Sequence, residues 1–119
     1  MEKSLTAKLT TSSDTRFRNM SLRMPRKAHD AIKALARDQS ARASDLYMEI
    51  VQGFVLAELP GRRHFFAVEN DAPAVTISVS ASFAALVRDT ASSRKVSSNE
   101  LIYTAVALHL ERDGSAENI

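Results

Sequence analysis

The stretch "NMSLRMP", residues 19–25, decides the fold, because polar and apolar side chains alternate along it until a proline ends the pattern. In an extended chain the apolar residues lie on one side and the polar residues on the other: Met20, Leu22 and Met24 against Asn19, Ser21 and Arg23. A strand this short is not stable alone, so the sequence predicts a partner strand elsewhere. Pro25 suits the first turn of a helix, where no amide donor is required.

Two helical stretches follow this strand, "RKAHDAIKALARDQ" (26–39) and "DLYMEIVQGFVLAEL" (45–59), and Pro60 and Gly61 end the second one. Their apolar residues recur at helical spacing. The residues expected to face inward are Ala28, Ile32, Leu35, Ala36, Leu46, Ile50, Val51, Phe54 and Val55. Gly53 inside the second helix costs about 1 kcal/mol relative to alanine. We expect a close helix crossing to explain it.

A shift of 55 residues brings the whole pattern back without a gap. The alternating strand returns as "AVTISVS" (74–80), and the helical stretches return as "ASFAALVRDTASS" (81–93) and "SNELIYTAVALHLER" (98–112). Identity is low, so chance alignment of apolar positions is the rival explanation, but the common phase of strand, break and helix favours a true repeat. The sequence predicts a mainly α fold with a two-stranded antiparallel ribbon, a tandem β-α-α-β-α-α pseudo-dimer in one chain.

These elements divide the chain into segments that together form one domain. The predicted segments are a flexible N-terminal arm (1–15), a first repeat (16–59), a linker (60–73), a second repeat (74–113) and a tail (114–119). The linker has three apolar residues, Phe65, Phe66 and Val68, which we expect to pack onto the helices.

Composition excludes several classes of function. With 119 residues, 45% hydrophobic and 25% charged, the chain fits one soluble domain, and the absence of cysteine removes disulfides and thiolate metal sites. The longest apolar run (101–110) is half a membrane span, and residues 1–15 lack a signal-peptide core, so we expect a cytoplasmic protein without membrane association. The histidines lack metal spacing and the glycines form no phosphate loop. We therefore expect no cofactor and no enzymatic activity.

The polar face of the predicted ribbon is the candidate functional surface. It carries Asn19, Ser21 and Arg23 from one strand and Ala74, Thr76 and Ser78 from the other. A two-stranded ribbon fits the major groove of B-DNA, where Arg pairs with guanine, Asn with adenine, and Ser or Thr with several base edges. Residues 16–59 contain eight basic and five acidic residues, which agrees with a polyanionic partner. The alternative is an ordinary polar surface facing solvent.

Residues 19–54, "NMSLRMPRKAHDAIKALARDQSARASDLYMEIVQGF", resemble the ribbon-helix-helix repressors of the Arc/MetJ family. The resemblance lies in the alternating strand, the Leu-Arg-apolar-Pro-Arg junction and the acidic-aliphatic-Tyr start of the second helix. In that family, outward strand residues read bases and the N-terminus of the second helix binds phosphate. Carried over to this chain, the base readers are Asn19, Ser21, Arg23, Thr76 and Ser78.

Phosphate binding at helix N-termini also has a physical basis, because free amides and the helix dipole attract anions there. "SSNE" (97–100) has the spacing of a capping box between Ser97 and Glu100. The matching place in the first half has Arg42 and Ser44 and no box, which leaves a charged side chain for a phosphate. The predicted phosphate ligands are Arg18, Arg26, Arg42, Ser44, Arg94, Lys95, Ser98 and Asn99. The alternative is that these helix ends are capped and do nothing else.

The presence of both units in one polypeptide resembles the TraY-type conjugation accessory proteins. Ala74 and Ser78 in place of Asn19 and Arg23 make the two strands unequal, which suits an asymmetric site on double-stranded DNA. The resemblance implies an accessory factor at a plasmid transfer origin, with a relaxase or other relaxosome protein as partner and several copies on adjacent DNA subsites. The alternatives are a transcriptional repressor and an antitoxin-like protein-interaction module, although the stretch "DGSAENI" (113–119) after the last helix is short for wrapping a toxin.

Overall fold

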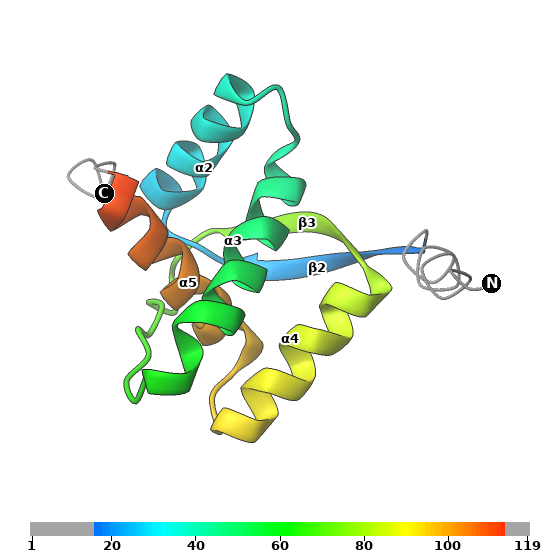
Figure 1. The fold of residues 1–119 in the computed structure, drawn as a ribbon. Helices are drawn as coiled ribbons and strands as arrows, with labels where there is room; N and C mark the ends of the chain where they lie inside the picture. The colour runs from blue at the N-terminus through cyan, green and yellow to red at the C-terminus, as the bar shows by residue number, and fades with distance from the viewer. Residues whose placement is uncertain (1–15, 114–119) are drawn as a thin grey trace.

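Four α-helices and a two-stranded antiparallel sheet make up the part of the chain that the computed structural model describes, residues 16–113. Their order is β2 (Phe17–Arg23), α2 (Arg26–Asp38), α3 (Ala43–Ala57), the 3₁₀ turn η1 (Leu59–Gly61), β3 (Ala74–Ser80), α4 (Ala81–Arg94) and α5 (Ser98–Asp113) (Figure 1). The predicted mainly α class with an antiparallel ribbon is confirmed. The predicted arm and tail lie outside the described residues.

The ribbon owes its two different faces to the register of its strands. Met20 lies opposite Ile77, Ser21 opposite Thr76, and Leu22 opposite Val75. Directly opposed residues share a face of an antiparallel pair, so apolar residues collect on one side of the ribbon. This inner face is buried at Leu22 and at Ile77, each with 2% of its surface exposed. The predicted alternation is therefore present in both strands.

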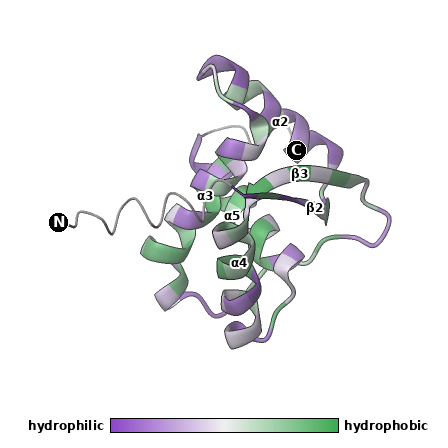
Figure 2. Ribbon diagram, turned by 90° about the vertical axis from the view of Figure 1, so that its right-hand side faces the viewer, coloured by the Kyte–Doolittle hydropathy of each residue, from purple (hydrophilic) through white to green (hydrophobic). Residues whose placement is uncertain are grey.

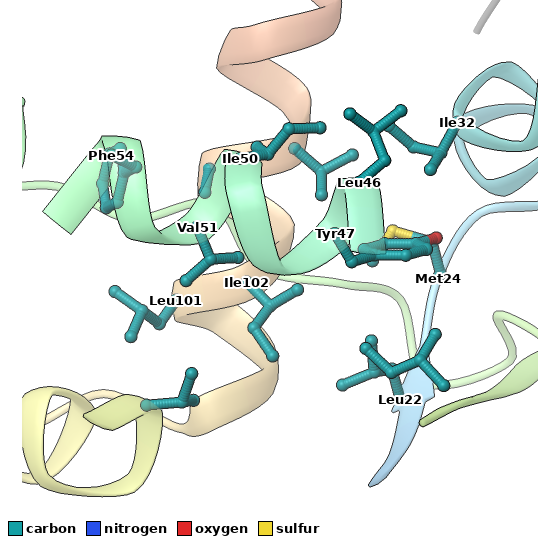
Figure 3. Packing of buried hydrophobic residues seen from close by; sticks show 14 of the residues in the cluster. Leu22, Met24, Ile32, Leu46, Tyr47, Ile50, Val51, Phe54, Leu101 and Ile102 are labelled. Carbon is teal, nitrogen blue, oxygen red and sulfur yellow. The ribbon is translucent and has the colours of Figure 1, made fainter. Parts of the chain in front are cut away.

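The helices bury the inner face of the ribbon and one another. α3 packs against α2, α5 and β3, while α4 packs against α5 and both strands. Figure 3 shows side chains of α3 lying against Leu101 and Ile102 of α5, with Leu22 and Met24 of the β2 segment nearby. Burial of each such side chain contributes about 1.5–3 kcal/mol. Leu35 and Val55, expected to face inward, are half-buried at the margin of this core.

Two details of α3 differ from expectation. The helix begins at Ala43, two residues earlier than predicted, because Arg42 adopts an extended backbone and acts as N-cap without a side-chain hydrogen bond. The expectation of a close helix crossing at Gly53 is wrong, because a Cβ built at this residue meets no atom within 4 Å. Gly53 is exposed and destabilises the helix relative to alanine, and packing does not require a glycine there.

The segment between η1 and β3 lies against α5. The backbone N–H of Phe66 donates a hydrogen bond to Thr104 Oγ1 (2.8 Å), and the Phe66 ring meets the Tyr103 ring edge-on with centroids 6.3 Å apart. Phe65 packs against the core. The expected packing of these aromatic residues is therefore found, although Phe66 keeps 39% of its surface exposed.

Candidate nucleic-acid interface

The outer face of the ribbon carries the predicted base readers. Asn19 lies opposite Ser78 and Ser21 opposite Thr76, with Arg23 opposite Ala74 at one end. All of these are exposed except Ser78, which is half-buried. Side chains opposite one another on one face lie about 5 Å apart at Cβ. The structure thus brings the five predicted base readers, Asn19, Ser21, Arg23, Thr76 and Ser78, onto one continuous polar surface.

Arg23 is held at the end of this surface. Its Nη1 donates a hydrogen bond to the carbonyl of Ala72 (2.8 Å), in the turn that precedes β3. A guanidinium has five donor hydrogens, so this one bond orients the group and leaves other donors for a ligand.

The N-termini of α3 and α5 contact the ribbon through two side chains. Ser44 Oγ accepts a hydrogen bond from the backbone N–H of Ser78 (2.9 Å). Asn99 Oδ1 accepts from the backbone N–H of Arg23 (2.6 Å), and Asn99 Nδ2 donates to the Arg23 carbonyl (2.9 Å). Because these groups would otherwise lie at unpaired strand edges, both side chains protect the ribbon.

These contacts give the side chains of Ser44 and Asn99 a role in holding the strand backbone. They do not use the Ser44 hydroxyl hydrogen or the second Nδ2 hydrogen of Asn99, so phosphate binding by these side chains, beside the main-chain amides of each helix end, stays a prediction. Sequence analysis missed the contact with the strands, although the two residues stand 55 positions apart and so share a place in the repeat pattern.

At the N-terminus of α3, the charge of Arg42 is paired with the carboxylate of Asp45 in the first turn. Arg42 Nε and Nη2 donate to the two carboxylate oxygens of Asp45, at 3.1 and 2.9 Å. This hydrogen bonding lowers the pKa of Asp45 and raises the pKa of Arg42. The Arg42 guanidinium also lies 5.9 Å from the centroid of the Phe17 ring. A phosphate at Arg42 would have to compete with Asp45, and phosphate binding by Arg42 stays a prediction.

The first turn of α5 contains the predicted capping box. Ser97 Oγ accepts from the backbone N–H of Glu100 (3.0 Å), and Glu100 Oε1 accepts from the backbone N–H of Ser97 (2.9 Å). The prediction of this box is confirmed. Ser98, predicted to bind phosphate, is half-buried in the same turn.

The basic residues at the end of α4 have different environments. Arg94 Nη2 donates to the carbonyls of Leu59 and Arg62, which fixes the end of η1. These bonds use only Nη2 and leave three donor hydrogens of the guanidinium, so phosphate binding by Arg94 stays a prediction. Lys95 is exposed and ends α4 with a left-handed backbone (φ 61°).

Arg18 and Arg26 lie at opposite ends of the ribbon. Arg18 pairs with Val79 and so belongs to the inner face, yet Arg18 is exposed whereas Val79 is fully buried. Arg26 is the first residue of α2, also exposed, and lies beside the opposite end of the ribbon.

A cavity of about 290 Å³ lies between α2 and the edge of β3. It is lined by Met24, Arg26, His29, Asp30, Lys33, Pro73, Ala74, Val75 and Thr76. His29 Nδ1 and the hydroxyl oxygen of Tyr47 lie 2.7 Å apart. Burial lowers the pKa of His29, with a smaller contribution from Lys33, and burial raises the pKa of Tyr47. Sequence analysis did not assign His29 or Lys33 to a site.

A larger cavity of about 500 Å³ lies between the start of α2 and residues 67–73, and Tyr103 contributes to its wall. Glu69 and Asp71 also line it, so it is unsuited to an anion. Within residues 16–113 no group of three or more His, Cys, Asp or Glu is placed to hold a metal ion. No helix of this described part is long and apolar enough for a membrane span.

No family model, no curated protein and no solved structure matches this chain. Its function is therefore argued from the geometry described above.

Proposed function

We propose that this protein is a tandem ribbon-helix-helix protein that binds double-stranded DNA, with the ribbon in the major groove. The observation that carries the proposal is the exposed polar face of the ribbon, with a helix N-terminus beside each of its ends. Both features are what groove binding requires, since side chains read base edges while helix N-termini meet phosphates.

A two-fold relation between the halves is supported by equivalent contacts. Ser21 and Thr76 oppose each other in the ribbon and stand 55 residues apart. Ser44 and Asn99, also 55 apart, contact Ser78 and Arg23, which are themselves 55 apart. A symmetry axis between Ser21 and Thr76 relates all of these pairs, as a pseudo-dimer in one chain requires.

The placement of the helix N-termini supports the same proposal. Ser44 contacts the backbone of Ser78 in β3, and Asn99 contacts the backbone of Arg23 in β2, so the two N-termini lie at opposite edges of the ribbon. A ribbon that enters the major groove has one phosphate backbone on each side. Amides at the two helix N-termini would therefore stand near phosphates on opposite sides of the groove.

The resemblance to TraY-type proteins extends this proposal to a biological role. The strands are unequal, with Asn19 and Arg23 on one and Ala74 and Ser78 on the other, so the surface suits a DNA site without internal symmetry. We infer an accessory role at a plasmid transfer origin with a relaxase as partner. The alternative is a repressor acting at a promoter. Sequences selected from a random pool separate the two, since the first role requires a site beside a nick.

The test of DNA reading is Arg23→Ala, measured on a duplex selected from a random pool and on unrelated DNA. Loss of a bidentate guanine contact costs about 1–3 kcal/mol at the selected duplex, and less on unrelated DNA. Arg37→Ala, an exposed arginine near the far end of α2, is the matched control. Equal losses on both DNAs would refute base reading by Arg23. Failure of the wild-type chain to retain any duplex would refute DNA binding altogether.

A further inference from the structure

Three polar donor side chains of α2 line a cavity at one edge of the ribbon. Arg26, His29 and Lys33 all line the 290 Å³ cavity whose other wall is formed by β3. Their spacing of three and four residues places them on one face of the helix. Ala74 and Thr76 in the opposite wall belong to the outer face of the ribbon. The cavity therefore opens beside the surface that carries the predicted base readers.

The chemistry of this cavity suits an anion. Arg26 and Lys33 are cationic, and Asp30 is the one acid among its lining residues. Lys33 Nζ and Asp30 Oδ1 are 3.7 Å apart with side chains 51% and 59% exposed, which is a loose pair that a phosphate can displace. In the tautomer in which the Tyr47 hydroxyl donates to His29 Nδ1, the other ring nitrogen carries the proton and is a further donor.

The opposite half of the chain lacks this arrangement. Fifty-five residues after Arg26, His29 and Lys33 stand Ala81, Ala84 and Arg88 on α4. Two of the three donors are thus replaced by alanine. Figure 2 shows the same contrast, since α2 is largely hydrophilic while α4 is pale or hydrophobic over most of its length.

We propose that the cavity between α2 and the edge of β3 binds a backbone phosphate of the DNA, on this side of the ribbon and not on the other. The inference rests on the proposed DNA binding, because a duplex lying on the outer ribbon face carries its phosphates past Ala74 and Thr76. It adds a contact that the N-termini of α3 and α5 do not provide.

The experiment measures the affinity of the full chain for a duplex selected from a random pool, between 50 and 200 mM salt. Loss of one phosphate contact reduces the salt slope by about 0.9, which changes the ratio of the affinities at these two salt concentrations by about 3.5-fold. We expect this change for Lys33→Ala and for Arg26→Ala. Arg88→Ala, which removes the basic residue 55 positions after Lys33, should leave the slope unchanged. If Arg26→Ala fails to fold, Lys33→Ala carries the test.

A second arm locates the phosphate on the DNA. Single phosphates of the duplex are replaced one at a time by neutral methylphosphonates. One position should weaken binding of the wild-type chain and of Arg88→Ala but have no effect on Lys33→Ala. A selected duplex bound with the same slope by all variants would overturn the phosphate site and leave DNA binding intact. Absence of any bound duplex would overturn both.

Discussion

Replacement of Asn99 tests whether the N-terminus of α5 is tied to the ribbon. Asn99→Ala removes two hydrogen bonds, one from the Arg23 N–H at 2.6 Å and one to the Arg23 carbonyl at 2.9 Å. Each such bond contributes about 0.5–1.5 kcal/mol net. Because these groups are exposed, water replaces part of the loss, and we expect a decrease of about 1–1.5 kcal/mol in the free energy of unfolding. Urea denaturation followed by circular dichroism measures it.

Neighbouring variants make this measurement specific. Ser98→Ala alters the same turn of α5 without touching the strand, and it should stay within 0.5 kcal/mol of the wild type, as is typical of surface substitutions. Asn99→Asp keeps the acceptor for the Arg23 N–H but places a carboxylate oxygen against the Arg23 carbonyl, so it should also destabilise. If Asn99→Ala were no less stable than Ser98→Ala, the two hydrogen bonds between Asn99 and Arg23 would contribute nothing to stability. A reduced salt slope for DNA in Asn99→Ala would show that this side chain also contacts a phosphate.

Two further predictions concern stability. Gly53→Ala should raise the urea midpoint by the equivalent of about 1 kcal/mol, because the added Cβ meets no atom within 4 Å and alanine favours the helix; a lower midpoint would show an unseen constraint on α3. Burial holds the pKa of His29 below its ordinary value of 6.5, so the unfolded chain binds more protons than the folded chain. The free energy of unfolding is therefore at its full value above pH 6.5 and decreases as the pH falls through the lower pKa of the folded state. His29→Gln should remove this decrease, and an unchanged pH profile in that variant would assign the titration to another group.

Local pattern was sufficient to predict the elements of the fold. The alternation in "AVTISVS" gave β3 its observed bounds, Ala74–Ser80, because strand periodicity and the turn residues before it are local properties. Ser97 and Glu100 form their capping box for the same reason, being three residues apart. The start of α3 was missed because Arg42 is the N-cap without a side-chain hydrogen bond, and arginine is not a residue type that indicates an N-cap.

The site was predicted less well, because its contacts join distant parts of the chain. The five predicted base readers share a face of the ribbon, as expected from the two-residue period of a strand. The engagement of Arg94 with Leu59 joins residues 35 positions apart, and that of Asn99 with Arg23 joins residues 76 apart, so neither follows from local pattern. The Arg42–Asp45 pair is three residues apart and could have been predicted from helix spacing. The cavity beside α2 could not be predicted, because it depends on how the fold places α2 next to β3, far apart in sequence.

Both strands of the ribbon belong to one polypeptide, and for the proposed DNA binding this would set how occupancy depends on protein concentration. A ribbon made from two separate chains is lost on dilution, because its assembly is bimolecular. Here β2 finds β3 within the same molecule, at an effective concentration fixed by the connecting chain. Occupancy of a single DNA site should then rise with the first power of concentration. Binding to that site would then show no concentration threshold for assembly of the ribbon.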